Sequence, residues 1–220
     1  MNESDDSSTV TEIFVRGWRV DEPMMDVFGQ CCPVLNFLRV LYLWNVGLTP
    51  ETVDMLASFL PLCEQLTTLN LDANPLGDSN VSHLIGDDSQ LENLSLRFCE
   101  LNDINAYGIG SALGTTKRWN RKLMNLNMSS NKIGDTGAIH IANGLKTNRA
   151  LLTLNMANNQ IGDKGGAALA GALSQFFLDQ EQVRSRMVTR ALVPQPWPWV
   201  KNCPNIQLTM HNSFNFELHL

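Results

Sequence analysis

The sequence is poor in the side chains from which catalytic and metal sites are built. Its 220 residues include only four histidines and five cysteines, and no two histidines have the spacing of a zinc protease. No serine, cysteine or aspartate nucleophile has an evident matching base. A glycine-rich string at 108–114 falls within a predicted helix, where packing explains it better than nucleotide binding. We therefore expect a protein that is not an enzyme and needs no cofactor.

Signals for membrane insertion, export and nucleic-acid binding are also lacking. The sequence has no run of about 18 apolar residues, so no membrane span is predicted. Its first stretch, 1–9, is acidic and polar, unlike a signal peptide, and we expect it to be disordered. The net charge of −6 argues against nucleic acid as a partner.

The cysteines are scattered, and their number is odd. Together with the lack of an export signal, this pattern predicts reduced thiols in the cytoplasm rather than a disulfide framework. The pair Cys31-Cys32 with Cys63 could suggest zinc, but no histidine and no C-x-x-C spacing supports such a site. No metal is therefore predicted.

What the sequence does contain is one pattern repeated along most of its length. The clearest copies are Leu123–Ile133 and Leu151–Ile161, which read L-x-x-L-x-L-x-x-N-x-L with Met or Ile at some Leu positions. Three further copies and a degenerate first one begin at Leu38, Leu66, Leu91 and Val10, respectively. The steps between successive starts are 28, 28, 25, 32 and 28 residues. This spacing is the leucine-rich-repeat signature.

The pattern predicts an α/β leucine-rich-repeat solenoid of about six repeats. The L-x-L alternation gives a short strand with one apolar face, which stacked copies bury together. The result is a short curved horseshoe, with a parallel sheet on the concave face and helices on the convex face. A 28-residue repeat with a full helix resembles the ribonuclease-inhibitor-like subfamily. We expect strands at 12–15, 40–43, 68–71, 93–96, 125–128 and 153–156.

The asparagine of the pattern has its own structural role. Its side chain is expected to turn inward and bond backbone groups of the bend that follows the strand. Asn74, Asn131 and Asn159 keep this role, whereas a small thiol, Cys99, replaces the carboxamide in the fourth repeat. The first two repeats have Trp18 and Val46 at this position, so the ladder should be imperfect toward the N-terminus.

The strand residues between the leucines should face the concave surface and offer a binding site. In the N-terminal half these residues are rich in aromatic side chains and arginine, the types that dominate interface hot spots. The candidate partner-binding residues are Phe14, Arg16, Tyr42, Trp44, Arg97 and Phe98. The alternative is that the polar N-terminal arm folds over Trp44 and Tyr42 and buries them. Ser129, in the flatter C-terminal half, is also expected to face outward.

A basic loop is predicted where the repeat step lengthens to 32 residues. It consists of Lys117, Arg118, Trp119, Arg121 and Lys122. This segment is either a solvated loop or a docking point for an acidic partner, with Trp119 as an apolar anchor.

The repeats occupy 10–178, and the chain continues beyond them. A helical extension is expected at 179–193, before Pro194 ends it. The stretch 194–220 has no leucine-rich pattern and is expected to be a divergent, irregular tail. It is either a foreign ending or a segment that binds a partner.

Four stretches, 37–49, 123–131, 151–164 and 176–186, are similar to a family of leucine-rich-repeat proteins associated with motile cilia. The resemblance implies a non-catalytic protein-interaction scaffold in the cytoplasm, with a place in the cilium or axoneme and a protein partner. The alternative is a regulator, activator or inhibitor, of a nucleotide-cycling enzyme such as a small GTPase, because related repeats include both kinds of regulator.

Overall fold

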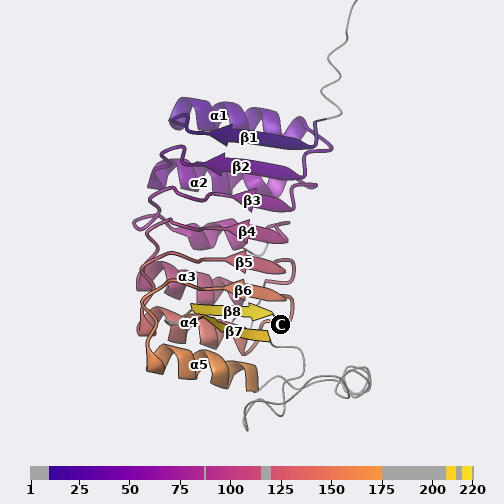
Figure 1. Cartoon of the computed structure of the whole chain (residues 1–220). Helices are drawn as coiled ribbons and strands as arrows, with labels where there is room; N and C mark the ends of the chain where they lie inside the picture. Colours follow the sequence, from indigo (N-terminus) through magenta and orange to yellow (C-terminus); the bar gives the residue numbers. More distant parts are fainter. Residues whose placement is uncertain (1–9, 87, 115–119, 175–206, 212–214, 220) are drawn as a thin grey trace, which may run out of the picture.

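The computed structural model describes residues 10–86, 88–114, 120–174, 207–211 and 215–219. Six strands lie side by side in chain order and pair in parallel, as the repeat spacing predicts (Figure 1). They are β1 (Glu12–Arg16), β2 (Val40–Trp44), β3 (Thr68–Asn70), β4 (Asn93–Ser95), β5 (Asn125–Asn127) and β6 (Thr153–Asn155). Equivalent leucines of neighbouring repeats are register partners, so the sheet repeats as the sequence does.

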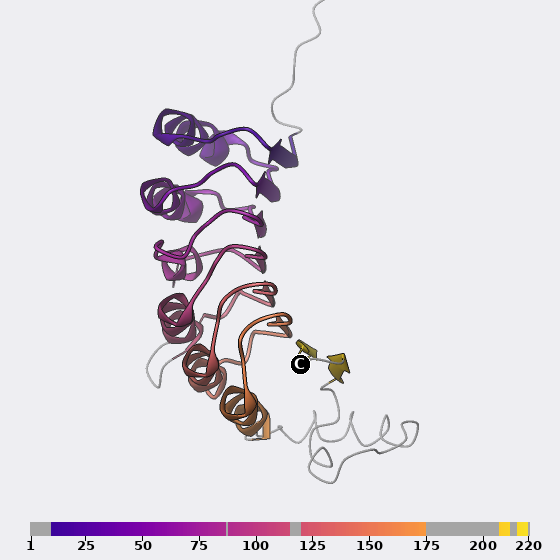
Figure 2. The same cartoon turned by 60° about the vertical axis from the view of Figure 1, so that its left-hand side comes forward.

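Helices form the second layer and line the convex side of the curved stack (Figure 2). The α-helices are α1 (Glu22–Cys31), α2 (Pro50–Phe59), α3 (Asp103–Leu113), α4 (Asp135–Leu145) and α5 (Asp163–Ser174). The 3-10 helices are η2 (Cys32–Val34), η3 (Leu60–Leu62) and η4 (Val81–Ile85). Helix α2 begins as its sequence predicts, because Thr49 and Thr52 cap each other's backbone N–H groups. No helix among the described residues combines the length and apolarity that a membrane crossing requires.

The core lies between the sheet and the helices. The leucines of each L-x-L unit are almost fully buried, as Leu41, Leu94 and Leu126 illustrate. Glycines allow neighbouring helices to pack closely, because a Cβ on Gly110 would collide with the backbone of His140 in α4. This packing explains the glycine-rich string at 108–114.

The third repeat departs from the predicted alternation of strand and helix. It is the 25-residue repeat, and its second half contains the short η4 in place of an α-helix. The segment is short by three residues and begins with Pro75, Gly77 and Asp78, which favour turns. This difference leaves a break in the convex layer between α2 and α3.

The C-terminal tail also differs from the prediction for 194–220. Two strands, β7 (Gln207–His211) and β8 (Asn215–His219), form an antiparallel pair, and β8 adds antiparallel to β6. Both segments alternate apolar and polar residues with the period of a strand, a signal that is independent of the leucine-rich pattern. The predicted helical extension at 179–193 lies outside the described residues.

Candidate partner-binding site on the concave face

The register of β1 and β2 brings four of the predicted site residues together. Phe14 pairs with Tyr42, and Arg16 pairs with Trp44. The rings of Phe14 and Tyr42 lie 5.2 Å apart between centroids, tilted by 31°. The guanidinium carbon of Arg16 lies 4.4 Å from the centroid of the Trp44 ring, a cation–π arrangement. We call these four residues the aromatic patch.

The aromatic patch is open to solvent. Phe14 is 63% exposed, whereas Tyr42 and Trp44 are half-buried and Arg16 is exposed. The N-terminal arm that could cover Trp44 and Tyr42, residues 1–9, lies outside the described residues. Within the described part of the chain, therefore, a large apolar area faces the concave side of the solenoid.

Arg97 and Phe98, the other two predicted site residues, lie two strands away from β2. Arg97 lines the same concave hollow as Tyr42, with a volume of 370 Å³, over a floor of asparagine and threonine side chains. Phe98 instead lines a separate hollow at the edge of the strands, with Glu100, Ser130 and Lys132 among its neighbours. The structure thus places Arg97 beside the same hollow as Tyr42, while Phe98 lines a second hollow with its ring 5.4 Å from the Arg97 guanidinium carbon.

Asp72 also lies on the concave face, although it is not one of the predicted site residues. Its side chain is only 6% exposed, yet it lines the hollow beside Tyr42 and Arg97. Asp72 Oδ1 accepts hydrogen bonds from Ser95 Oγ at 2.6 Å and from the Arg97 backbone N–H at 2.8 Å. Its Oδ2 accepts from Asn70 Nδ2 at 3.1 Å. These bonds fix the backbone of Arg97 at the edge of the hollow. They join residues of adjacent strands, so they could not be predicted without the alignment of those strands.

Carboxamides cover the C-terminal half of the concave face. Asn125 Nδ2 donates to Asn93 Oδ1, and Asn93 Nδ2 donates to Thr68 Oγ1. Asn127 Oδ1 accepts from the Ser129 backbone N–H at 3.1 Å. Ser129 itself is 7% exposed, so the prediction that it faces freely outward is wrong. Its carbonyl accepts a hydrogen bond from the Phe98 backbone N–H of the preceding repeat.

The predicted basic loop is described only in part. Lys117, Arg118 and Trp119 lie outside the described residues. Arg121 and Lys122 are exposed, directly after the buried Asn120. Its role as a docking point therefore stays a prediction.

The described cysteines are not disulfide-bonded, and three of the four are buried. Burial raises the pKa of the Cys32 thiol to about 12 and that of Cys63 to about 11. In the described part of the chain, no three His, Cys, Asp or Glu side chains gather as metal ligands would. These thiols lie in the core and stay protonated at neutral pH, as unreactive structural cysteines do.

The comparisons with known proteins agree with the repeat architecture. Residues 120–142 and 147–170 match a family model described as Leucine Rich repeat. NACHT, LRR and PYD domains-containing protein 12 of Mus musculus is 34% identical over 113 residues, which are 50% of this chain and 10% of that protein. Ribonuclease inhibitor of Sus scrofa is 30% identical over 125 residues, which are 53% of this chain and 26% of that protein.

This chain thus covers only a small part of either relative. Among solved structures, a chain titled Leiomodin-1 Actin-Binding Site 2 aligns with a TM-score of 0.42 and 18% identity, over 79% of this chain and 87% of that one. An alignment of this quality carries no information about shared partners.

Proposed function

We propose that this leucine-rich-repeat chain is a non-catalytic scaffold that binds a protein partner through the concave aromatic patch. Solenoids of this kind present extended concave surfaces that bind other proteins. The proposal needs no reaction chemistry, because contact area and hydrogen-bonding groups are sufficient for binding.

The observation that carries the proposal is the exposed pairing of Phe14 with Tyr42 and of Arg16 with Trp44. Aromatic and arginine side chains supply most of the binding energy at protein interfaces. Here they are already stacked on each other, so their rotamers need little further ordering when a partner binds. Hydrogen-bonding carboxamides beside them would form the polar rim that such a site needs.

The patch can be tested by capturing partners on the immobilised full-length chain. Trp44→Ala should reduce recovery of a specific partner strongly, measured by quantitative mass spectrometry of proteins captured from ciliated cells. Leu62→Ala is the matched control, because Leu62 is 62% exposed but lies in η3, away from the sheet. Both variants should keep the wild-type circular dichroism spectrum. Equal capture by wild type and Trp44→Ala would contradict the proposal.

We further propose a cytoplasmic location in the cilium or axoneme. The support is the similarity of 37–49 and 151–164 to leucine-rich repeat-containing protein 71, together with free thiols that suit a reducing compartment. Imaging of the tagged chain in multiciliated cells tests this location. Exclusion of the tagged chain from axonemes would contradict it.

Regulation of a nucleotide-cycling enzyme is the second candidate function, and it rests on Arg16 and Arg97. An activator would have to present an arginine or another polar group to the enzyme's nucleotide site. Both guanidinium groups lie over aromatic rings, Arg16 over Trp44 and Arg97 over Phe98, which favours a contact role. GTP turnover by a panel of small GTPases separates the two functions. Acceleration that Arg16→Ala abolishes would favour the regulator.

A further inference from the structure

The convex surface is interrupted at the third repeat. Helix α1 packs on α2, and α3, α4 and α5 pack in succession, but η4 alone fills the space between α2 and α3. Since η4 is a single short 3-10 helix, it does not reach as far outward as its neighbours. The missing helix leaves a groove on the face opposite to the aromatic patch.

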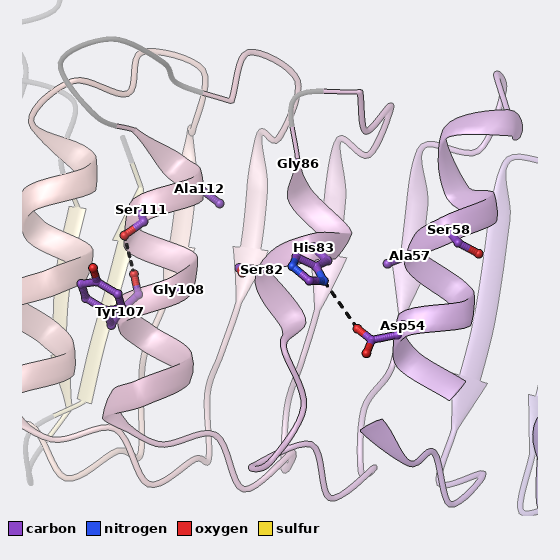
Figure 3. A pocket seen from close by; sticks show the side chains of 10 residues that line it. All are labelled: Asp54, Ala57, Ser58, Ser82, His83, Gly86, Tyr107, Gly108, Ser111 and Ala112. Carbon is purple, nitrogen blue, oxygen red and sulfur yellow. Dashed lines mark hydrogen bonds and ion pairs between the residues drawn. The ribbon is translucent and has the colours of Figure 1, made fainter. Parts of the chain in front are cut away.

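The groove has a volume of 770 Å³ and is bounded by three elements (Figure 3). Small side chains form most of its walls: Ala57 and Ser58 from α2, Ser82 and Gly86 at η4, and Gly108, Ser111 and Ala112 from α3. Small residues on both walls permit a backbone to approach closely, as they do where helices pack at short range. The walls thus have the dimensions and the composition to receive one helix.

Two larger features mark opposite sides of the groove. On the α3 side, Tyr107 is 58% exposed, and its ring meets the His140 ring edge-on at 4.8 Å. On the α2 side, Asp54 Oδ1 lies 3.5 Å from His83 Nδ1 of η4 (Figure 3). Asp54 is the only acidic side chain among the described residues that line the groove, and no lysine or arginine is among them. The groove therefore combines an aromatic side chain on one wall with a carboxylate on the other, and one oxygen of that carboxylate already faces His83.

We propose that this groove binds an α-helix of a partner protein, with small apolar residues on its contacting face and a lysine or arginine opposite Asp54. Three features specify that occupant. The groove lies where the regular repeat would place its own helix, its wall side chains are mostly small, and the exposed Asp54 carboxylate at its edge would attract a cation. The occupant would complete the convex layer, and its binding would be independent of the concave patch.

A selection experiment with defined peptides tests this proposal. A displayed library of 15-residue helices, with an alanine framework and five randomised positions on one face, is selected against the full-length chain. The same library is counter-selected against Ser111→Trp, which fills the groove from an exposed position on α3. The enriched helices should carry lysine or arginine together with alanine, glycine or leucine. A selection that enriches no sequence over the Ser111→Trp counter-target would overturn the proposal.

Variants of Asp54 and Tyr107 then locate the enriched helices on the protein. Asp54→Lys should weaken the best peptide about threefold to fivefold, the range of an exposed ion pair, and should shift a repeat selection toward glutamate and aspartate. Tyr107→Ala should weaken it about fivefold or more, as loss of an aromatic anchor does. Glu64→Lys, an exposed charge reversal outside the groove, should leave affinity unchanged. Peptides whose affinity responds to Trp44→Ala but not to Asp54→Lys or Tyr107→Ala would overturn the proposal.

Discussion

The two ends of the solenoid close their bends differently. In the fourth and fifth repeats, the Asn131 side chain holds two bends at once: its Oδ1 accepts from the Cys99 and Leu101 N–H groups, and its Nδ2 donates to Leu96 and Met128. At the N-terminal end, Trp18 occupies the equivalent position and is 70% exposed. The residue at this position therefore has a different environment at each end.

The geometry of the ladder explains this difference. Each asparagine bonds its own bend and the bend of the preceding repeat. Asn74 donates to the Leu71 carbonyl of its own bend and to the Leu43 carbonyl of the preceding one, and it accepts from the Val46 N–H. No repeat precedes the first one among the described residues, so within them an asparagine there would bond only the groups of its own bend, as Asn131 does through Met128 and Ser129. The bend of the first repeat is closed instead by backbone bonds, such as that from the Val20 N–H to the Val46 carbonyl. Replacing the asparagine therefore lowers stability least in the first repeat, where an aromatic side chain, Trp18, can occupy the position.

The largest predicted loss of stability, from leucine-to-alanine substitution in the core, should be the same at both ends, because the leucine core does not differ between them. Leu126→Ala and Leu41→Ala each remove a fully buried side chain and should each destabilise the protein by about 2–5 kcal/mol. Urea denaturation of both variants measures this. A much smaller loss for Leu41→Ala would mean that the N-terminal repeats unfold separately from the rest.

Substitutions at the position of the asparagine ladder should change the unfolding free energy by different amounts at the two ends. Asn131→Ala strands several buried backbone groups and should cost about 1–3 kcal/mol. Trp18→Ala, at the equivalent position, should change the unfolding free energy by less than about 0.5 kcal/mol, because its side chain is mostly in solvent. Similar denaturation midpoints for the two variants would show that the ladder contributes little to stability at either end.

Cys99 offers an intermediate case within the ladder. Its thiol donates to the Leu71 and Arg97 carbonyls, and burial raises its pKa to about 12. Below about pH 9 the thiol is protonated in both the folded and the unfolded chain. Between about pH 9 and 12 only the unfolded chain ionises there, so the unfolding free energy should fall, by about 1 kcal/mol from this residue at pH 10.

The measurement is denaturation of wild type and Cys99→Ala from pH 8 to pH 10.5. The alanine variant should be less stable at pH 8, where it lacks the thiol's hydrogen bonds, but should lose less stability as pH rises. Parallel pH profiles would mean that Cys99 ionises in the folded chain as readily as in the unfolded one.

The repeat spacing predicted the features that depend only on the position of a residue within its own repeat. The six parallel strands and the inward asparagines follow from counting residues. The burial of outward-facing residues was not predictable in this way. Asp72 and Ser129 are buried because side chains and bends of adjacent repeats cover them.

Other features had a signal in the sequence whose meaning needed the structure. The 25-residue step marked the third repeat as short, but the step alone did not indicate which element was lost. Asn120 and Asn148 are also 28 residues apart and act as a second ladder. Each accepts from the N–H of the first leucine of its repeat and donates to the carbonyl of a preceding turn. The spacing of these two asparagines is visible in the sequence, whereas the inward orientation of their side chains is not.

A further small effect concerns Phe98, whose exposed contacts and backbone conformation favour different residue types. Phe98 has φ +55°, in the left-handed region, and the equivalent residues Asn45 and Asn158 have φ +50° and +55°. Asparagine tolerates this conformation better than a bulky aromatic residue does. Phe98→Asn should therefore raise the unfolding free energy, but by less than about 1 kcal/mol, because the exposed contact with Arg97 is lost.

Asn45→Phe provides the converse change at an exposed position and should lower stability by a similar amount. Thermal denaturation of the two variants, followed by the capture assay, distinguishes two reasons for an aromatic residue at 98. Gain of stability with loss of capture would mean that Phe98 is retained for a contact, as a second binding region beside the aromatic patch. Gain of stability with unchanged capture would restrict binding to the patch on β1 and β2. A loss of stability would instead mean that Phe98 packs more favourably than its 53% exposure implies, and its backbone conformation would then be no sign of function.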